Sequence, residues 1–182
     1  MAEIRIDKIE AARRQIDTAV RLLFSNEDPV AIHTLTAAGF RVLRDLAEKK
    51  GTAKTHQFIK MMIRPGKEKE FWRVFNKIAN FLKHADSDPE LMLEGFQEQA
   101  NDFLLIGTTF YYQDLGYSLT REMTALQMWF AAAYSDIMEP KPRGESELER
   151  QNTEQISLMS RSQHLALGKK ILECAAYMNF GS

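Results

Sequence analysis

The sequence predicts an all-α fold, a single-domain bundle of six or seven mostly antiparallel helices. Three observations indicate this class. Apolar residues recur at three- and four-residue steps in several segments, as they do on one face of a helix. The 182 residues include only five prolines and nine glycines but nine methionines, a composition that favours helices packed on helices. A chain of this length is most simply one domain with its own core.

The first two helices are expected over residues 3–24 and 29–50. The apolar stripe of the first is Ile9, Ala12, Ile16, Ala19, Val20 and Leu23. Asp28 can cap the second helix, Pro29 fits its first turn, and Gly51 ends it. Its stripe is Ile32, Leu35, Ala38, Gly39, Val42, Leu43 and Leu46, and the small residues 37–39 allow another helix to approach closely. We interpret His33, one turn into this helix, as a partly buried histidine bonded to a neighbour.

A shorter helix is expected over residues 55–63, ended by Pro65 and Gly66. The next helix carries the buried face Phe71, Phe75, Ile78 and Leu82, which Trp72 and Ala79 widen. Asp88 and Pro89 then repeat the helix-start signal of Asp28 and Pro29. Two alternatives follow: a short extended piece at 91–96 before a helix over 97–115, or one helix throughout. This segment is apolar on most sides, which predicts a heavily buried helix.

The C-terminal third predicts two further helices. Residues 119–137 form one, with Met123, Leu126, Trp129, Phe130 and Ala133 facing inward. We expect residues 1–138 to be the bundle core, the E-P-K-P-R segment within 139–152 a linker, and 153–182 a C-terminal helix. A capping box at 146–149 precedes this last helix, which runs to about Met178. Its apolar face is thin between Met159 and Leu167, so it packs either on its own domain or on a second subunit.

The composition excludes several classes of protein. The single cysteine, Cys174, allows neither an internal disulfide nor a cysteine-based zinc site and suits a reducing compartment. The charged N-terminus, M-A-E-I-R-I-D-K-I-E, has no apolar signal core, and no run approaches 18 apolar residues. We therefore expect a cytoplasmic protein with no membrane partner.

A net charge of −1 conceals a separation of charge along the chain. Residues 41–83 contain twelve Lys or Arg and four Asp or Glu, a balance of +8. Residues 84–120 contain seven Asp or Glu and no Lys or Arg, a balance of −7. The functional interpretation is a basic surface that attracts phosphate, followed by an acidic patch. The alternative is two solvated faces that pair with each other inside the fold.

The sequence motifs indicate no metal and no cofactor. Residues 86–90, D-S-D-P-E, fail as an EF-hand because proline stands at the fourth place and no glycine at the sixth. There is no phosphate-binding glycine loop, dinucleotide fingerprint, H-E-x-x-H or G-x-S-x-G motif. Capping by Asp88 explains the acidic segment better than a metal does.

The best catalytic candidates are His84, Asn80 and Lys77, at the junction of the basic and acidic segments. They are spaced by four and three residues and so share one helix face. Such a ladder can hold a phosphate or move a proton. The alternative is a histidine that caps the carbonyls of its own helix. Four cations of the basic segment are the candidates for binding phosphate or nucleic acid: Lys83, Arg73, Lys67 and Lys60.

Two stretches carry a resemblance to known proteins. The motif A-x-H-T-L around His33, with N-F-x-K-H-A-D-x-D-P from Asn80 to Pro89, resembles a group of small helical bacterial proteins of uncharacterised function over residues 28–135. More loosely, the helix ending in His84 is similar to the HEPN superfamily of helical bundles. Their motif is Arg, four to six residues, then His. Here His84 matches the histidine, and Lys77 stands where that motif has arginine.

The HEPN resemblance implies a metal-independent ribonuclease of a toxin–antitoxin or phage-defence system, with its motif paired across a homodimer. Two hypotheses follow. In the first, a HEPN-like protein binds or cleaves RNA, with His84 as general base or acid, Lys77 and Lys83 on phosphate and Asn80 orienting the scissile group. In the second, the chain is a non-catalytic subunit whose basic and acidic faces dock partner proteins. A third, weaker option is a bundle that binds a small ligand or a nucleotide.

Overall fold

Six α-helices account for most of the described part of the chain, which comprises residues 3–52, 63, 66–84, 89–135 and 154–175 of the computed structural model. They are α1 (Lys8–Phe24), α2 (Pro29–Lys50), α4 (Glu68–Phe81), α5 (Ala100–Asp114), α6 (Arg121–Ala133) and α8 (Arg161–Ala175). These residues contain no β-strand, so the predicted all-α class is confirmed. None of the described helices is long and apolar enough to cross a membrane.

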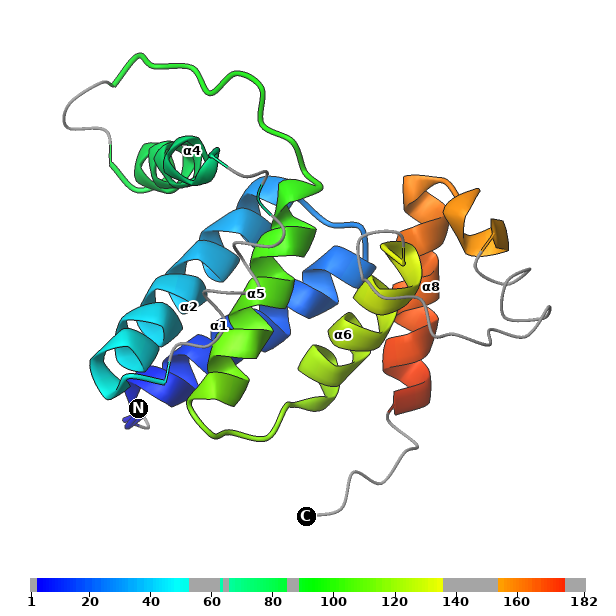
Figure 1. Cartoon of the computed structure of the whole chain (residues 1–182), viewed down its shortest axis with the longest axis horizontal. Helices are drawn as coiled ribbons and strands as arrows, with labels where there is room; N and C mark the ends of the chain where they lie inside the picture. Colours follow the sequence, from blue (N-terminus) through cyan, green and yellow to red (C-terminus); the bar gives the residue numbers. More distant parts are fainter. Residues whose placement is uncertain (1–2, 53–62, 64–65, 85–88, 136–153, 176–182) are drawn as a thin grey trace.

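The helices pack around α1 (Figure 1). It lies against α2 and also contacts α5, α6 and α8, while α2 packs on α5 and α6 packs on α8. Helix α4 contacts α2 and crosses the bundle: Figure 1 looks nearly along its axis, whereas α2 and α5 lie across the view. Helices α4 and α8 therefore lie on opposite sides of a core formed by α1, α2, α5 and α6.

The helix ends follow local signals in the sequence. Asp28 caps α2, accepting a hydrogen bond from the Ala31 backbone N–H at 2.8 Å, and Pro29 occupies the first turn. Gly51 ends α2 with φ +68°, a left-handed conformation that glycine adopts without steric cost. Both ends of the predicted second helix are confirmed. Asp7 and Thr120 cap α1 and α6 in the same way as Asp28 caps α2.

The core lies where α5 and α6 meet α1 and α2. Its largest fully buried side chains include Trp129, Tyr111, Phe40 and Phe130. The prediction that the segment before Leu115 is heavily buried is confirmed, since ten of the fifteen residues of α5 are buried. Gly39 permits the close approach of α1, because a Cβ there would lie 3.2 Å from Ile16 Cγ1.

One buried carboxylate joins α1 to the start of α6. Asp17 accepts a hydrogen bond from the Thr120 hydroxyl at 2.6 Å and forms an ion pair with Arg13 at 2.9 Å. Burial raises the pKa of Asp17, and the bonds from Thr120 and Arg13 oppose that rise. Since Thr120 also caps α6, this carboxylate fixes where α6 begins relative to α1.

The structure differs from the predictions in several places. The first helix, predicted over residues 3–24, begins at Lys8 after the capping residue Asp7, and the helix predicted over 119–137 runs from Arg121 to Ala133. Phe71 is not part of the buried face of α4, since 37% of it is exposed. Residues 91–99 are not helical, which decides between the two alternatives for the start of α5. The prediction of one long last helix is wrong. A helical turn at 154–157 is followed by a break, and α8 begins at Arg161.

A capping box explains the break. The Gln163 backbone N–H donates to Ser160 Oγ at 3.3 Å, and Gln163 Oε1 accepts from the Ser160 N–H at 2.8 Å. Helix α8 then packs on α6 and α1 of the same chain. The predicted helix at 55–63 and the predicted linker at 139–152 lie outside the described residues, apart from Ile63, which is buried.

Candidate functional site

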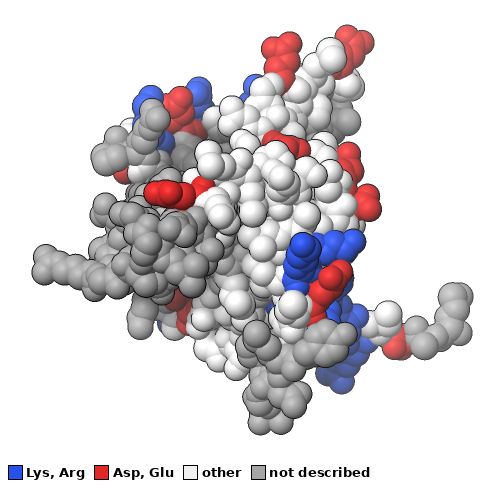
Figure 2. Space-filling model, turned by 90° about the vertical axis from the view of Figure 1, so that its right-hand side faces the viewer, with Lys and Arg blue, Asp and Glu red and all other residues white. Residues whose placement is uncertain are grey.

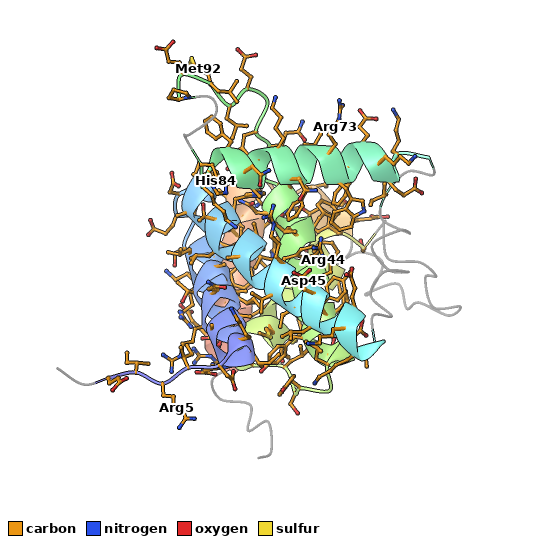
Figure 3. All side chains as sticks on the ribbon, turned by 90° about the vertical axis from the view of Figure 1, so that its left-hand side faces the viewer. Arg5, Arg44, Asp45, Arg73, His84 and Met92 are labelled. Carbon is orange, nitrogen blue, oxygen red and sulfur yellow. The ribbon has the colours of Figure 1, made fainter. Side chains whose placement is uncertain are left out.

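The C-terminal end of α4 presents the predicted catalytic residues to solvent. Lys77, Asn80 and His84 are all exposed. The helix ends on the Asn80 carbonyl, which accepts hydrogen bonds from the backbone N–H groups of Lys83 and His84, both at 3.0 Å. Figure 3 shows His84 at this end of α4, beside the start of α2. The three side chains thus lie on one accessible edge of the molecule.

An arginine from α2 reaches this edge. Arg41 Nη2 lies 3.3 Å from Asn76 Oδ1 and 3.3 Å from Asn80 Oδ1. Both are long hydrogen bonds from a charged donor to neutral amides. Arg41 of α2 thus adds a positive charge beside Asn80 of α4. No pattern within α4 indicates it, because Arg41 and Asn80 are 39 positions apart.

Lys83 lies within electrostatic reach of Arg41. Its pKa is lowered, first by partial burial of the ammonium group and second by the positive charge of Arg41. The described residues provide no carboxylate that forms an ion pair with Arg41, Lys77 or Lys83, whereas Arg44 pairs with Asp45 and Lys67 with Glu70. Two adjacent cations without a counter-charge repel each other and favour an anion between them.

The remaining predicted phosphate-binding residues lie apart from this end. Arg73 is exposed on α4, and Figure 3 shows it pointing away from α2. Lys67 precedes the first turn of α4 and is engaged by Glu70 at 2.6 Å, roughly 20 Å along the helix from Asn80. Lys60 lies outside the described residues. The structure therefore brings together Asn80, Lys83 and Arg41, with His84 next in the chain.

His33 does not belong to the site. It is buried, and its Nδ1 lies 2.9 Å from Asn101 Oδ1. Asn101 uses its Nδ2 to donate to the Pro29 carbonyl, so its oxygen is the acceptor and His33 Nδ1 carries the hydrogen. Burial lowers the pKa of His33, the bond to Asn101 opposes this, and the charge of Lys83 adds to it. The interpretation of His33 as a histidine bonded to a neighbour is confirmed, and the residue is buried rather than partly buried.

A second polar cluster joins α5, the end of α6 and the start of α8, and no sequence pattern pointed to it. Arg161 donates to both carboxylate oxygens of Asp102, at 2.5 and 2.8 Å, and the Tyr134 hydroxyl donates to the same carboxylate at 2.5 Å. Asp102 is fully buried. Burial raises the pKa of Asp102, while Arg161 and Tyr134 offset part of that rise. We call these three residues the Asp102 cluster.

The aromatic surroundings hold the Asp102 cluster in place. The Arg161 guanidinium lies 5.9 Å from the centroid of the Trp129 ring, and Trp129 Nε1 donates to the His164 carbonyl at 2.7 Å. Within the described residues no three His, Cys, Asp or Glu side chains are grouped as metal ligands would be. Comparisons of the chain with family models, with curated proteins and with solved structures found no match.

Proposed function

We propose that the chain binds the phosphate groups of RNA at the junction of α2 and α4. The site, which we call the α2–α4 cation pair, consists of Arg41, which is hydrogen-bonded to Asn80, and Lys83, which follows Asn80 by three residues. The observation that carries the proposal is that these two cations lie close enough to shift the pKa of Lys83 and pair with no carboxylate of the described residues. A phosphate oxygen between them would remove the repulsion and bind both charges.

Asn80 and Lys77 extend the proposed site along α4. Arg73, Lys77 and Asn80 are spaced by four and three residues and are all exposed, so they form one solvent-facing stripe. His84 follows at the end of this stripe. A strand of RNA that placed one phosphate at the α2–α4 cation pair would pass this histidine, which is the candidate general acid or base for cleavage.

The test is RNA binding measured by fluorescence anisotropy with a labelled single-stranded RNA over a series of salt concentrations. The double variant Arg41→Gln, Lys83→Gln is expected to bind about tenfold or more weakly, and the slope of log K against log salt is expected to fall by about 1.4, since each single-strand phosphate contact contributes about 0.7. The control is Lys169→Gln, Lys170→Gln, two exposed lysines on α8 with the same change in net charge.

Equal losses in both double variants would show that only net charge matters and would refute the site. Absence of RNA binding to the unmodified chain at low salt would refute the function. Cleavage is tested separately by incubating the same RNA with the unmodified chain and with His84→Ala. Cleavage that His84→Ala abolishes, with RNA affinity retained, would establish the catalytic role of His84.

A second candidate function is protein docking, and a different flank of α4 favours it. Phe71 and Val74 are 37% and 47% exposed and lie on the flank away from Asn76 and Asn80. A second copy of the chain is the partner that the HEPN resemblance implies. Sedimentation of the unmodified chain and of Phe71→Ser at the same concentrations tests this function. A dimer that Phe71→Ser dissociates supports it, and a monomeric unmodified chain contradicts it.

A further inference from the structure

A hollow of about 310 Å³ lies beside the Asp102 cluster, on the side of the molecule away from α4. Its walls are Phe103 of α5, Ala133 and Tyr134 at the end of α6, and Met159, Arg161 and His164 around the start of α8. Gln99, which is exposed, stands at its rim. Ligand pockets for small molecules begin at about this size. The volume suits a molecule of one or two fused rings.

The walls of the hollow are held rigidly. Arg161 is fixed by both oxygens of the buried Asp102, and Tyr134 by a hydrogen bond to the same carboxylate. The rings of Phe103 and Tyr134 contact each other with centroids 5.0 Å apart. His164 is fixed by the hydrogen bond of its Nε2 to the Ile156 carbonyl at 2.7 Å. A ligand would therefore meet a preformed surface and would lose little affinity to ordering it.

The chemistry of the walls selects for a flat ring without net charge. Phe103, Tyr134 and His164 present π-systems, and Met159 presents a thioether that packs well against aromatic rings. The charge of Arg161 is already neutralised by Asp102. Figure 2 shows the side of the molecule that carries α8, where the charged side chains of the described residues lie mainly around the edge of a broad uncharged area. Neither a phosphate nor a carboxylate finds a free cation among these wall residues.

His164 supplies the polar contact. A carbonyl oxygen can only accept, so His164 Nε2, bonded to Ile156 O, must carry the hydrogen. In the neutral ring Nδ1 is then an acceptor, and it has no hydrogen-bond partner among the described residues. A ring N–H of a ligand in the hollow matches this acceptor.

We propose that this hollow binds a small neutral heteroaromatic molecule that carries a ring N–H, such as a nucleobase or an indole. The rings of Phe103 and Tyr134 provide its apolar contacts, and His164 Nδ1 accepts from its N–H. This site is independent of RNA binding at the α2–α4 cation pair, because the two share no residue and no helix.

The probes that test the proposal are indole and benzofuran, which have the same shape but differ by the ring N–H. Each is titrated into the unmodified chain, and two-dimensional NMR spectra report its binding. Indole is expected to bind saturably at millimolar concentration and to shift the resonances of Phe103, Tyr134 and His164. Benzofuran is expected to bind about two- to tenfold more weakly, because it lacks the one hydrogen bond to His164.

A pair of variants locates the site. Ala133→Leu fills the hollow and is expected to weaken indole binding at least about tenfold. Ala131→Leu, an exposed residue of the same helix, is expected to leave indole binding unchanged. Unchanged binding by a folded Ala133→Leu would overturn the proposal. So would equal affinities of indole and benzofuran, or the absence of saturable binding by either probe, both of which are measured on the unmodified chain.

Discussion

Helices α4 and α8 are both added to the core of α1, α2, α5 and α6, and an arginine lies at each junction. Arg161 of α8 meets a fully buried carboxylate with two short hydrogen bonds. Arg41, beneath α4, meets two neutral amide oxygens, both at 3.3 Å. The first arginine is committed to holding the fold together. The second has no carboxylate partner among the described residues, and the proposed anion binding on the α4 side rests on this difference.

The comparison is tested most strongly by the same substitution at both arginines. Arg161→Met leaves the buried Asp102 carboxylate without its cation, with only the Tyr134 hydroxyl still donating to it, and is expected to lower the free energy of unfolding by about 3–5 kcal/mol at neutral pH. Arg41→Met breaks only weak exposed contacts and is expected to cost below about 1 kcal/mol. Urea denaturation of the two variants and the unmodified chain measures both values. Equal losses would remove the distinction between the two junctions.

The loss in Arg161→Met is expected to depend on pH. Without Arg161, burial raises the pKa of Asp102 further above its ordinary value of 3.8. Between the ordinary value and the raised value the folded state binds a proton that the unfolded state does not, so stability falls as pH rises through that window. The deficit relative to the unmodified chain should therefore shrink as pH is lowered toward 4. A deficit independent of pH would show that Asp102 is not the cause.

A smaller loss of stability is expected from a substitution where α8 packs against α1. A Cβ on Gly168 would lie 2.2 Å from Phe24 Cε1, and Phe24 is buried against Trp129. Gly168→Ala is therefore expected to cost about 1–2 kcal/mol, because overpacking costs about 1–3 kcal/mol and the better helix propensity of alanine returns up to about 1 kcal/mol. Gly39→Ala is the comparison variant and is expected to cost less, since its Cβ would lie 3.2 Å from Ile16 Cγ1 and 3.5 Å from the Ala12 carbonyl oxygen. A larger fall in the thermal unfolding temperature for Gly39→Ala than for Gly168→Ala would contradict the close packing of α8 against Phe24.

The smallest expected effect is a change in the pKa of Lys83. Arg41→Met removes the positive charge that helps to lower the pKa of this lysine, so the pKa is expected to rise toward 10.5. A bound phosphate should raise it as well. NMR titration of the lysine Cε resonances measures both shifts. A Lys83 pKa that does not respond to Arg41→Met would mean that the two cations are not neighbours in solution, and the α2–α4 cation pair would lose its basis.

Much of the fold could be predicted because its signals are local. Asp28 and Pro29 start α2 whatever packs around them, and the stripe from Ala12 to Leu23 is buried as its spacing indicates. The start of α8 also had a local signal, the Ser160–Gln163 capping box. The polar residues between Met159 and Leu167 left open whether this segment packs on its own domain or on a second subunit. In the structure the segment contributes Arg161 and the His164 carbonyl to contacts within the same chain.

The two polar clusters had no local signal. Arg41 and Asn80 belong to different helices, and Arg161 lies 59 positions from Asp102. Each residue alone is an ordinary charged or polar residue of a helix, and only the packing of α4 on α2 and of α8 on α6 brings the partners together. The exposure of Lys77, Asn80 and His84 agrees with the predicted stripe. The contact of Arg41 with Asn80 could not be read from the spacing of residues in α4.

The hydrogen bond from Trp129 to the His164 carbonyl also makes the detachment of α8 from α6 measurable by hydrogen exchange. The chain has two tryptophans, Trp72 on α4 and Trp129 on α6. Trp129 is fully buried, and its indole hydrogen is held by a carbonyl in the first turns of α8. That hydrogen can exchange with deuterium only when α8 lifts away, whereas Trp72 is half-buried. Exchange of the Trp129 indole hydrogen therefore reports the opening of α8, and the Trp72 signal in the same spectrum serves as a less protected reference.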